Sequence, residues 1–113
     1  MSHKAEVLQG TLDLMVLKAL DAMGPLHGYG IARRLEQISD AVLKLNEGTV
    51  YTSLMRLMQR GWISAEWGVS ENNRKARFYA ITRAGCRQLA REQENWDRIS
   101  GVVTRVLRFA ARS

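Results

Sequence analysis

Apolar side chains recur at three- and four-residue steps along residues 8–23, and this spacing predicts an amphipathic helix. The residues that define the steps are Leu8, Leu12, Met15, Ala19, Leu20 and Met23. Leu14, Val16 and Leu17 widen the apolar surface, so we expect this helix to be buried on more than one side. Gly24 and Pro25 end it, because both residues disfavour continued helix.

Two further helices are expected, over residues 28–39 and 47–60, the first of them beginning at Gly28 or at His27. The inner face of the first would carry Ile31, Leu35 and Ile38, and that of the second Val50, Leu54, Leu57 and Met58. Asn46 is a suitable N-cap, since its side-chain oxygen can accept a hydrogen bond from a free N–H in the first turn. Gly61 suits the end of the helix, because glycine enters the left-handed region without penalty.

The period then changes to two over residues 62–69, which predicts a strand. Residues 70–75 are polar and typical of a turn, and residues 77–81 form a second short strand. The two strands should make a hairpin with a charged tip. Trp62 and Trp67 flank the first strand, and we expect them in the core or in packing within the hairpin.

Thr82 can cap a last helix that continues to about residue 108. Its apolar positions are spaced like the seam of a coiled coil, at Leu89, Trp96, Ile99, Val103, Val106 and Ala110. Glu92 interrupts this seam, and Gly101 weakens the helix. A helix of this length cannot bury its whole stripe against so small a domain, so we expect a homodimer. The expected interface residues are Leu8, Leu12, Met15, Leu89, Trp96, Ile99, Val103 and Val106.

The order of elements predicts a mainly α protein with one small β-hairpin: a winged helix-turn-helix. Residues 1–82 would form the DNA-binding region and residues 83–113 the dimerisation helix, within one compact domain. In this arrangement the third helix enters the major groove, which is wide enough for one helix.

Composition is consistent with such a role. The 113 residues carry a formal net charge of +6, which favours polyanionic partners such as nucleic acid or an anionic membrane surface. Cys86 is the only cysteine, so no intrachain disulfide can form and a reducing cytoplasmic location is expected. The chain shows no signal-peptide pattern at its start and no apolar run of membrane-spanning length, so we expect no membrane association.

Four strings together resemble the short form of the PadR-like transcriptional regulators. They are LQGTLDLMVLKAL (8–20), GPLHGYGIARRL (24–35), NEGTVYTSLMRLMQRGWI (46–63) and EWGVSENNRKARFYAITRAG (66–85). The likeness extends from residue 8 to about residue 89. Thr52 departs from it, because members of the family often have proline at that position. The resemblance implies a winged helix-turn-helix regulator of transcription that binds double-stranded DNA.

The start of the third helix carries the first group of expected DNA contacts. Its outward positions are Glu47, Gly48, Thr49, Tyr51, Thr52 and Ser53. Small residues and free N–H groups at a helix start allow close approach to phosphate. We therefore expect Thr49, Tyr51 and Thr52 to contact phosphates or base edges. Tyr51 could instead be a half-buried aromatic residue of the core.

The second group lies at the start of the second helix and in the hairpin. Tyr29 is a candidate phosphate anchor, whereas His27 is expected to close the preceding turn by hydrogen bonding. Cations on a hairpin tip suit the sugar-phosphate backbone or a minor groove. The expected hairpin contacts are Asn73, Arg74, Lys75 and Arg77.

Other functions find less support in the residues. No glycine-rich phosphate loop, nucleophile pair or metal-ligand spacing is present, so we expect neither an enzyme nor a cofactor or metal. Trp96 could be an ordinary interface aromatic, or could line a pocket for an aromatic or cationic effector. A repressor on a pseudo-palindromic operator is the main hypothesis. The alternative is a protein-interaction module that binds no DNA.

Overall fold

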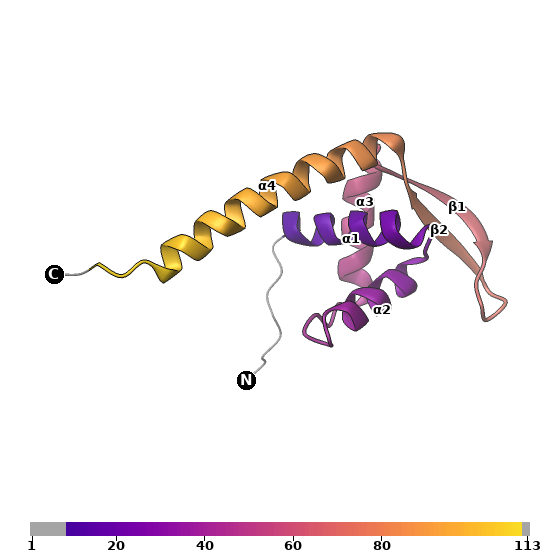
Figure 1. The fold of residues 1–113 in the computed structure, drawn as a ribbon. Helices are drawn as coiled ribbons and strands as arrows, with labels where there is room; N and C mark the ends of the chain where they lie inside the picture. Colours follow the sequence, from indigo (N-terminus) through magenta and orange to yellow (C-terminus); the bar gives the residue numbers. More distant parts are fainter. Residues whose placement is uncertain (1–8, 112–113) are drawn as a thin grey trace.

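The structure is a computed structural model that describes residues 9–111. Four helices and one two-stranded hairpin follow one another (Figure 1), which confirms the predicted fold class. The elements are α1 (Gln9–Met23), α2 (Gly28–Ile38), α3 (Glu47–Gln59), β1 (Ile63–Val69), β2 (Lys75–Ile81) and α4 (Arg83–Arg108). Three short helices form the body, the hairpin extends from one side, and α4 projects from the body in the other direction.

Local hydrogen bonds set the starts of three helices. The Asn46 side chain accepts from the backbone N–H of Thr49 at 2.7 Å, and Thr82 accepts from Gly85 at 3.0 Å. Both predicted N-caps are therefore confirmed. His27 caps α2, because its Nδ1 accepts from the N–H of residue 30 at 3.0 Å. Gly61 follows α3 with a φ of 74°, in the left-handed region.

The core lies where α1, α2 and α3 meet. Its buried apolar residues are Leu12, Val16, Leu17, Ala19, Leu20, Ile31, Ala32, Leu35, Val50, Leu54, Leu57, Ile63, Tyr79 and Leu89. Met58 only packs against this core from its edge. The expectation that Ile38 lies on the inner face was wrong: its side chain is 63% exposed. Ile38 is the last residue of α2, and the helix has left the core by that point.

The hairpin pairs β1 and β2 antiparallel, with Trp67 opposite Arg77 and Val69 opposite Lys75. β2 begins two residues earlier than predicted, because the backbone ladder continues through Ala76 and the exposed Lys75, which pair with Gly68 and Val69. Leu26 adds a bridge to this ladder, exchanging two backbone hydrogen bonds with Tyr79 at 3.1 and 2.8 Å. This bridge ties the hairpin to the connection between α1 and α2.

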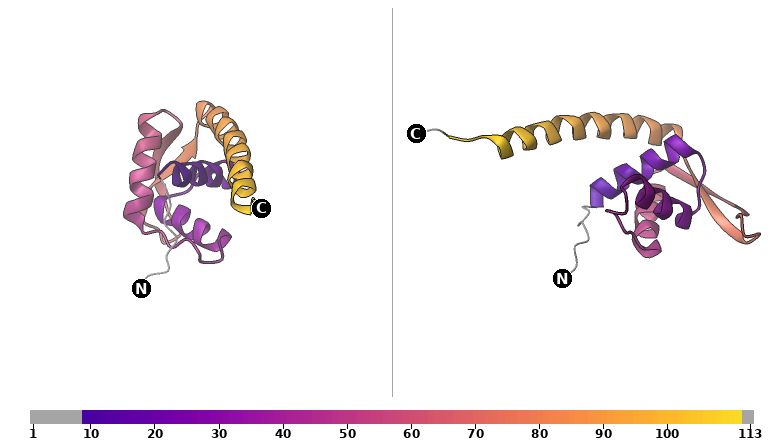
Figure 2. Two further views of the ribbon diagram at one scale, coloured as in Figure 1. Left: turned by 90° about the vertical axis from the view of Figure 1, so that its left-hand side faces the viewer. Right: turned by 60° about the horizontal axis from the view of Figure 1, so that its bottom comes forward.

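Only the first turns of α4 contact the body. Gly85 and Leu89 are its buried residues, and beyond them the helix extends away (Figure 2), giving the chain a longest dimension of 65 Å. Its exposed apolar side chains are Trp96, Ile99, Val102, Val103, Val106 and Leu107. The predicted seam position Ala110 lies beyond the helix, which ends at Arg108.

The structure places the expected interface residues in two groups. Leu12 and Leu89 are buried in the core of the chain itself, so these two leucines have little surface left for a partner. Met15 packs against the core and is partly buried. The α4 residues from Trp96 onward remain exposed. Leu8 lies outside the described residues.

Candidate nucleic-acid interface

A groove of about 1020 Å³ lies between the hairpin and the N-terminal turns of α2 and α3. It joins three segments that are far apart in the sequence. Its polar and aromatic lining residues include His27, Tyr29, Arg33, Arg34, Gln37, Glu47, Tyr51, Trp67, Ser70, Glu71, Asn72, Arg74, Lys75, Arg77 and Tyr79.

The groove is cationic. Arg33, Arg34, Arg74, Lys75 and Arg77 line it, against the acidic Glu47 and Glu71. Among the described residues, ion pairs form only between Lys18 and Asp21 and between Arg56 and Asp13. The groove cations are therefore not neutralised by acidic side chains of the described part of the chain. Such a surface attracts a polyanion.

The first turns of α3 present one aromatic residue to the groove. Tyr51 lines the groove and is 51% exposed, and it is not among the residues of the core. Thr49 and Thr52 lie on the same exposed turns but outside the groove lining. The Thr52 hydroxyl donates to the carbonyl oxygen of Gly48 at 2.9 Å, which leaves its oxygen free to accept. Of the predicted contacts on α3, the structure brings Tyr51 to the groove.

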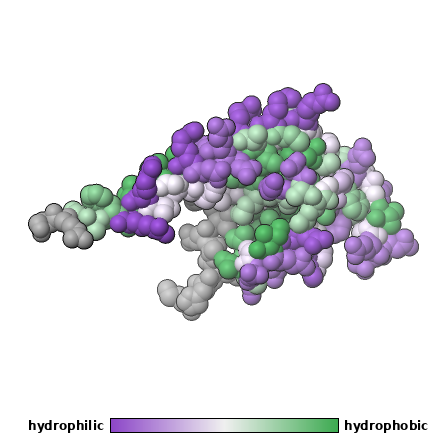
Figure 3. Space-filling view, viewed as in Figure 1, coloured by the Kyte–Doolittle hydropathy of each residue, from purple (hydrophilic) through white to green (hydrophobic). Residues whose placement is uncertain are grey.

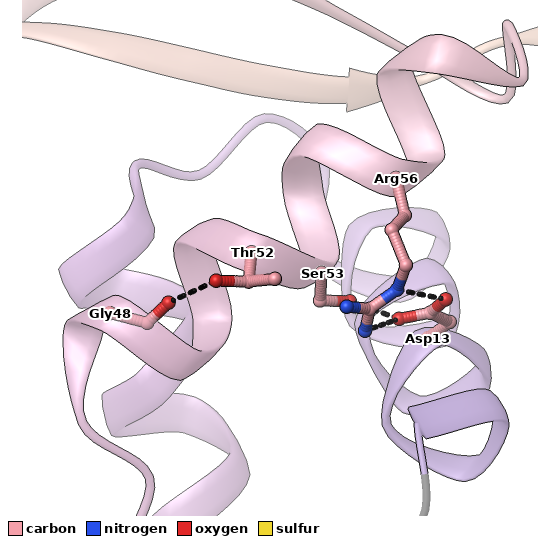
Figure 4. A network of polar contacts seen from close by, with 5 residues as sticks. All are labelled: Asp13, Gly48, Thr52, Ser53 and Arg56. Atoms are coloured by element: carbon pink, nitrogen blue, oxygen red, sulfur yellow. Dashed lines mark hydrogen bonds and ion pairs between the residues drawn. The ribbon is translucent and has the colours of Figure 1, made fainter.

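The outward placement of Ser53 was wrong. Its side chain is fully buried and donates a hydrogen bond to the Asp13 carboxylate on α1. Arg56 donates to the same carboxylate from Nη2 at 2.7 Å and from Nε at 3.1 Å (Figure 4). These hydrogen bonds raise the pKa of Arg56 above its ordinary value, with a smaller contribution from the Asp13 charge. This network holds α3 against α1 and so sets the position of its exposed first turns.

The start of α2 adds a second aromatic residue. Tyr29 is 52% exposed, and Arg33 donates to its hydroxyl at 3.2 Å while its guanidinium lies 5.8 Å from the ring centroid. Arg33 and Arg34, which also line the groove, were not among the DNA contacts predicted from the sequence. A pattern of outward charges shows which face of a helix is exposed, but not that a hairpin lies opposite.

Trp67 organises the cations of the hairpin. Lys75 Nζ lies 4.9 Å and Arg77 Cζ 5.9 Å from the centroid of its ring, distances typical of cation–π contact. Trp67 is 63% exposed, so the expectation of hairpin packing holds and that of core burial does not. At the tip, Asn73 adopts a φ of 59°, and its neighbour Arg74 lines the groove.

Residues 9–111 contain neither a membrane-spanning helix nor a cluster of metal ligands. None of the helices described is both long and apolar enough to cross a membrane. Within the same residues, no group of three or more His, Cys, Asp or Glu side chains is arranged to hold a metal ion.

Three packed helices, a cationic hairpin and a long projecting helix together define a winged-helix regulator of transcription. The chain belongs to the transcriptional regulator PadR-like family, whose model matches residues 16–91. Members of this family are regulators and not enzymes. The resemblance found in the sequence is thereby confirmed.

Solved structures share this fold, and curated proteins share part of the sequence. A transcriptional regulator from Clostridium thermocellum superposes with a TM-score of 0.79 and 26% identity, over 89% of this chain and 97% of that one. A PadR-like transcriptional regulator from Bacillus cereus shares the fold, with a TM-score of 0.78 and 24% identity over 94% and 100%. An uncharacterised 37.1 kDa transposon protein from Streptomyces fradiae is 37% identical over 90 residues, or 80% of this chain. The chain spans only 24% of the length of that relative.

Proposed function

We propose that the chain binds double-stranded DNA sequence-specifically as a homodimer and represses transcription. The observation that carries this proposal is the groove between the hairpin and the starts of α2 and α3, with five cations and two acidic residues in its lining. A recognition helix beside a basic wing is the arrangement that places side chains in a major groove and cations on the adjacent backbone.

The hairpin and the helices would make different kinds of contact. Arg74, Lys75 and Arg77 would bind phosphates, because cations at the edge of the groove need no particular base beside them. The neutral amide of Asn73, at the tip of the hairpin, would donate a hydrogen bond to a phosphate oxygen. Tyr29, Thr49, Tyr51 and Thr52 would contact phosphates and base edges from the helix starts. Specificity would then come from α3, and much of the affinity from the hairpin.

The projecting half of α4 supports the dimer. Trp96, Ile99, Val103 and Val106 are between 47% and 67% exposed, and they recur along one face of the helix. An apolar stripe of this kind needs a partner, and a second copy offers an identical stripe. The interface would combine this stripe with Met15 of α1. Twofold symmetry then predicts a pseudo-palindromic operator, with half-sites about 34–36 Å apart.

An effector could act at the same interface. Trp96 is 48% exposed on the stripe, and two such rings facing each other across a dimer would bind a flat aromatic or cationic molecule. Binding there would change the separation of the two α3 helices and hence the affinity for the operator.

The test is a titration with DNA selected from a random pool, measured by gel shift at several salt concentrations. Binding through phosphates predicts that log K falls linearly with log salt, by about 0.9 for each phosphate neutralised. Repeating the selection with aromatic or cationic compounds tests the effector. A pool that yields no enriched sequence, or an affinity indifferent to salt, would favour an interaction module that binds no DNA.

A further inference from the structure

A second cationic surface runs along α4, separate from the groove. We name it the arginine face. It consists of Arg83, Arg87, Arg91, Arg98, Arg105 and Arg108. All of these side chains are exposed. They recur mainly at steps of four and seven residues, which places them along one side of the helix.

This side is opposite to the one that meets the body. Arg91 follows the buried Leu89 by two residues, and Arg98 and Arg105 follow Trp96 and Val103 by the same step. Two residues correspond to roughly half a turn of helix. The arginine face therefore points away from both the core and the apolar stripe, and it stays exposed when the stripe pairs with a second copy. In Figure 3 the outer edge of α4 is accordingly hydrophilic.

The length of α3 separates the arginine face from the groove. The first residues of α3 line the groove, whereas Gly61 and Trp62, just beyond its other end, are hydrogen-bonded to Thr82 at the start of α4, at 2.8 and 3.0 Å. A helix of 13 residues is about 20 Å long. A straight duplex seated in the groove therefore does not reach the arginine face.

The arginines have no acidic partner among the described residues, where the ion pairs lie on α1 and between α1 and α3. Their side-chain hydrogen bonds are to neutral groups: Arg91 donates to Gln88 at 2.7 Å and Arg98 to Asn95 at 3.2 Å. Three acidic residues lie within the same stretch of α4: by helical spacing Glu94 falls among the arginines, Asp97 at their edge, and Glu92 on the opposite side. The face thus carries a row of charges whose counter-charge has to come from solution or from a partner.

We propose that the arginine face binds a second duplex segment of DNA, so that the protein bridges two segments. From Arg83 to Arg108 the row is about 37 Å long, close to one turn of duplex at 34–36 Å. Every cation in it is arginine, whose planar fork binds phosphate through two parallel hydrogen bonds. The inference rests on the proposed function only in that the groove binds the first segment.

The test uses energy transfer, at low salt, between two duplexes of random sequence, one labelled with a donor and the other with an acceptor. Each duplex is long enough to occupy both grooves of the proposed dimer, so that a second duplex has to bind elsewhere. Arg91→Gln with Arg98→Gln removes two charges from the face, and glutamine retains helix propensity. Lys18→Gln with Arg60→Gln removes the same charge elsewhere. Arg74→Gln with Lys75→Gln weakens the groove. Binding of one labelled duplex is measured separately by anisotropy, and circular dichroism checks that each variant is folded.

We expect energy transfer with the wild type and with the Lys18/Arg60 variant. The Arg91/Arg98 variant should need a roughly tenfold higher concentration of the second duplex to give the same transfer. Its binding of a single duplex should be normal. Transfer retained by the Arg91/Arg98 variant, or absent in the wild type, overturns the inference. An equal loss of single-duplex binding in that variant also overturns it, because the arginines would then belong to the first site. Single-duplex binding that is indifferent to Arg74 and Lys75 instead contradicts the proposed function.

Discussion

Arg56 on α3 and Asp13 on α1 form a pair with two hydrogen bonds, of 2.7 and 3.1 Å, although 43 positions separate them in the sequence. The side chains are only 23% and 18% exposed, so water screens the pair less than it does a surface ion pair. The same carboxylate accepts from the buried hydroxyl of Ser53. The position of α3, and with it one wall of the groove, depends on this contact.

Asp13→Ala should lower the free energy of unfolding by about 2–3 kcal/mol, because it removes charge-assisted hydrogen bonds and leaves the Ser53 hydroxyl buried without a partner. Urea denaturation followed by circular dichroism measures this. The matched control on the same helix is Asp21→Ala. Asp21 forms an ion pair with Lys18 at 3.8 Å, and both side chains are more than a third exposed. A change of about 0.5 kcal/mol or less is expected there. Similar losses in the two variants would contradict the role of Asp13.

Replacing either of two glycines of α4 with alanine should change the stability of the chain, in opposite directions. A Cβ at Gly85 would overlap the carbonyl oxygen of Trp62 and lie 2.7 Å from Cγ1 of Ile81, whereas one at Gly101 would meet nothing within 4 Å. Gly85→Ala should therefore destabilise the chain by about 2–3 kcal/mol through overpacking. Gly101→Ala should stabilise it by about 0.5–1 kcal/mol, because glycine is a poor helix former. Thermal melts at one protein concentration check both, and a tolerated Gly85→Ala would show that α4 is not seated against Trp62.

Arg74→Ala and Tyr51→Ala should weaken operator binding in different ways. Loss of Arg74 should lower the affinity for all DNA sequences by a similar factor. It should also reduce the slope of log K against log salt by about 1, because one phosphate is no longer neutralised. Loss of Tyr51 should cost roughly tenfold in affinity for the selected operator, with little change in slope. Arg60→Ala is the control, because Arg60 is an exposed cation at the far end of α3. Normal binding by the Arg74 and Tyr51 variants would show that the groove is not the DNA site.

Ile99→Glu should convert the dimer to a folded monomer, because a charge at the centre of the apolar stripe cannot be buried unpaired. Ile99 is 47% exposed in the single chain, so the fold itself should tolerate the change. Sedimentation velocity gives the oligomeric state. Thr104→Glu adds the same charge at an exposed position off the stripe and should remain dimeric. A dimeric Ile99→Glu would place the interface elsewhere.

Residue patterns predicted the structure correctly where the controlling contact is local. The capping bonds of Asn46 and Thr82 each reach only three residues along the chain, so residue types and spacing were sufficient to predict them. The patterns failed where the contact is distant. Ser53 was expected on the surface, but it is buried against Asp13, which lies 40 positions away in the sequence. Helical periodicity does not show which distant element packs against a given face.

The amino-acid sequence by itself determined the elements, their caps and the family, because each depends on residue types at short, regular separations. Only the tertiary structure decided which residues share the groove. The Leu26 bridge brings the hairpin beside α2, and the Asp13–Arg56 pair places α3. It also decided that Leu89 is buried within the chain while Val103 remains exposed, because burial depends on which elements pack together rather than on an apolar pattern alone.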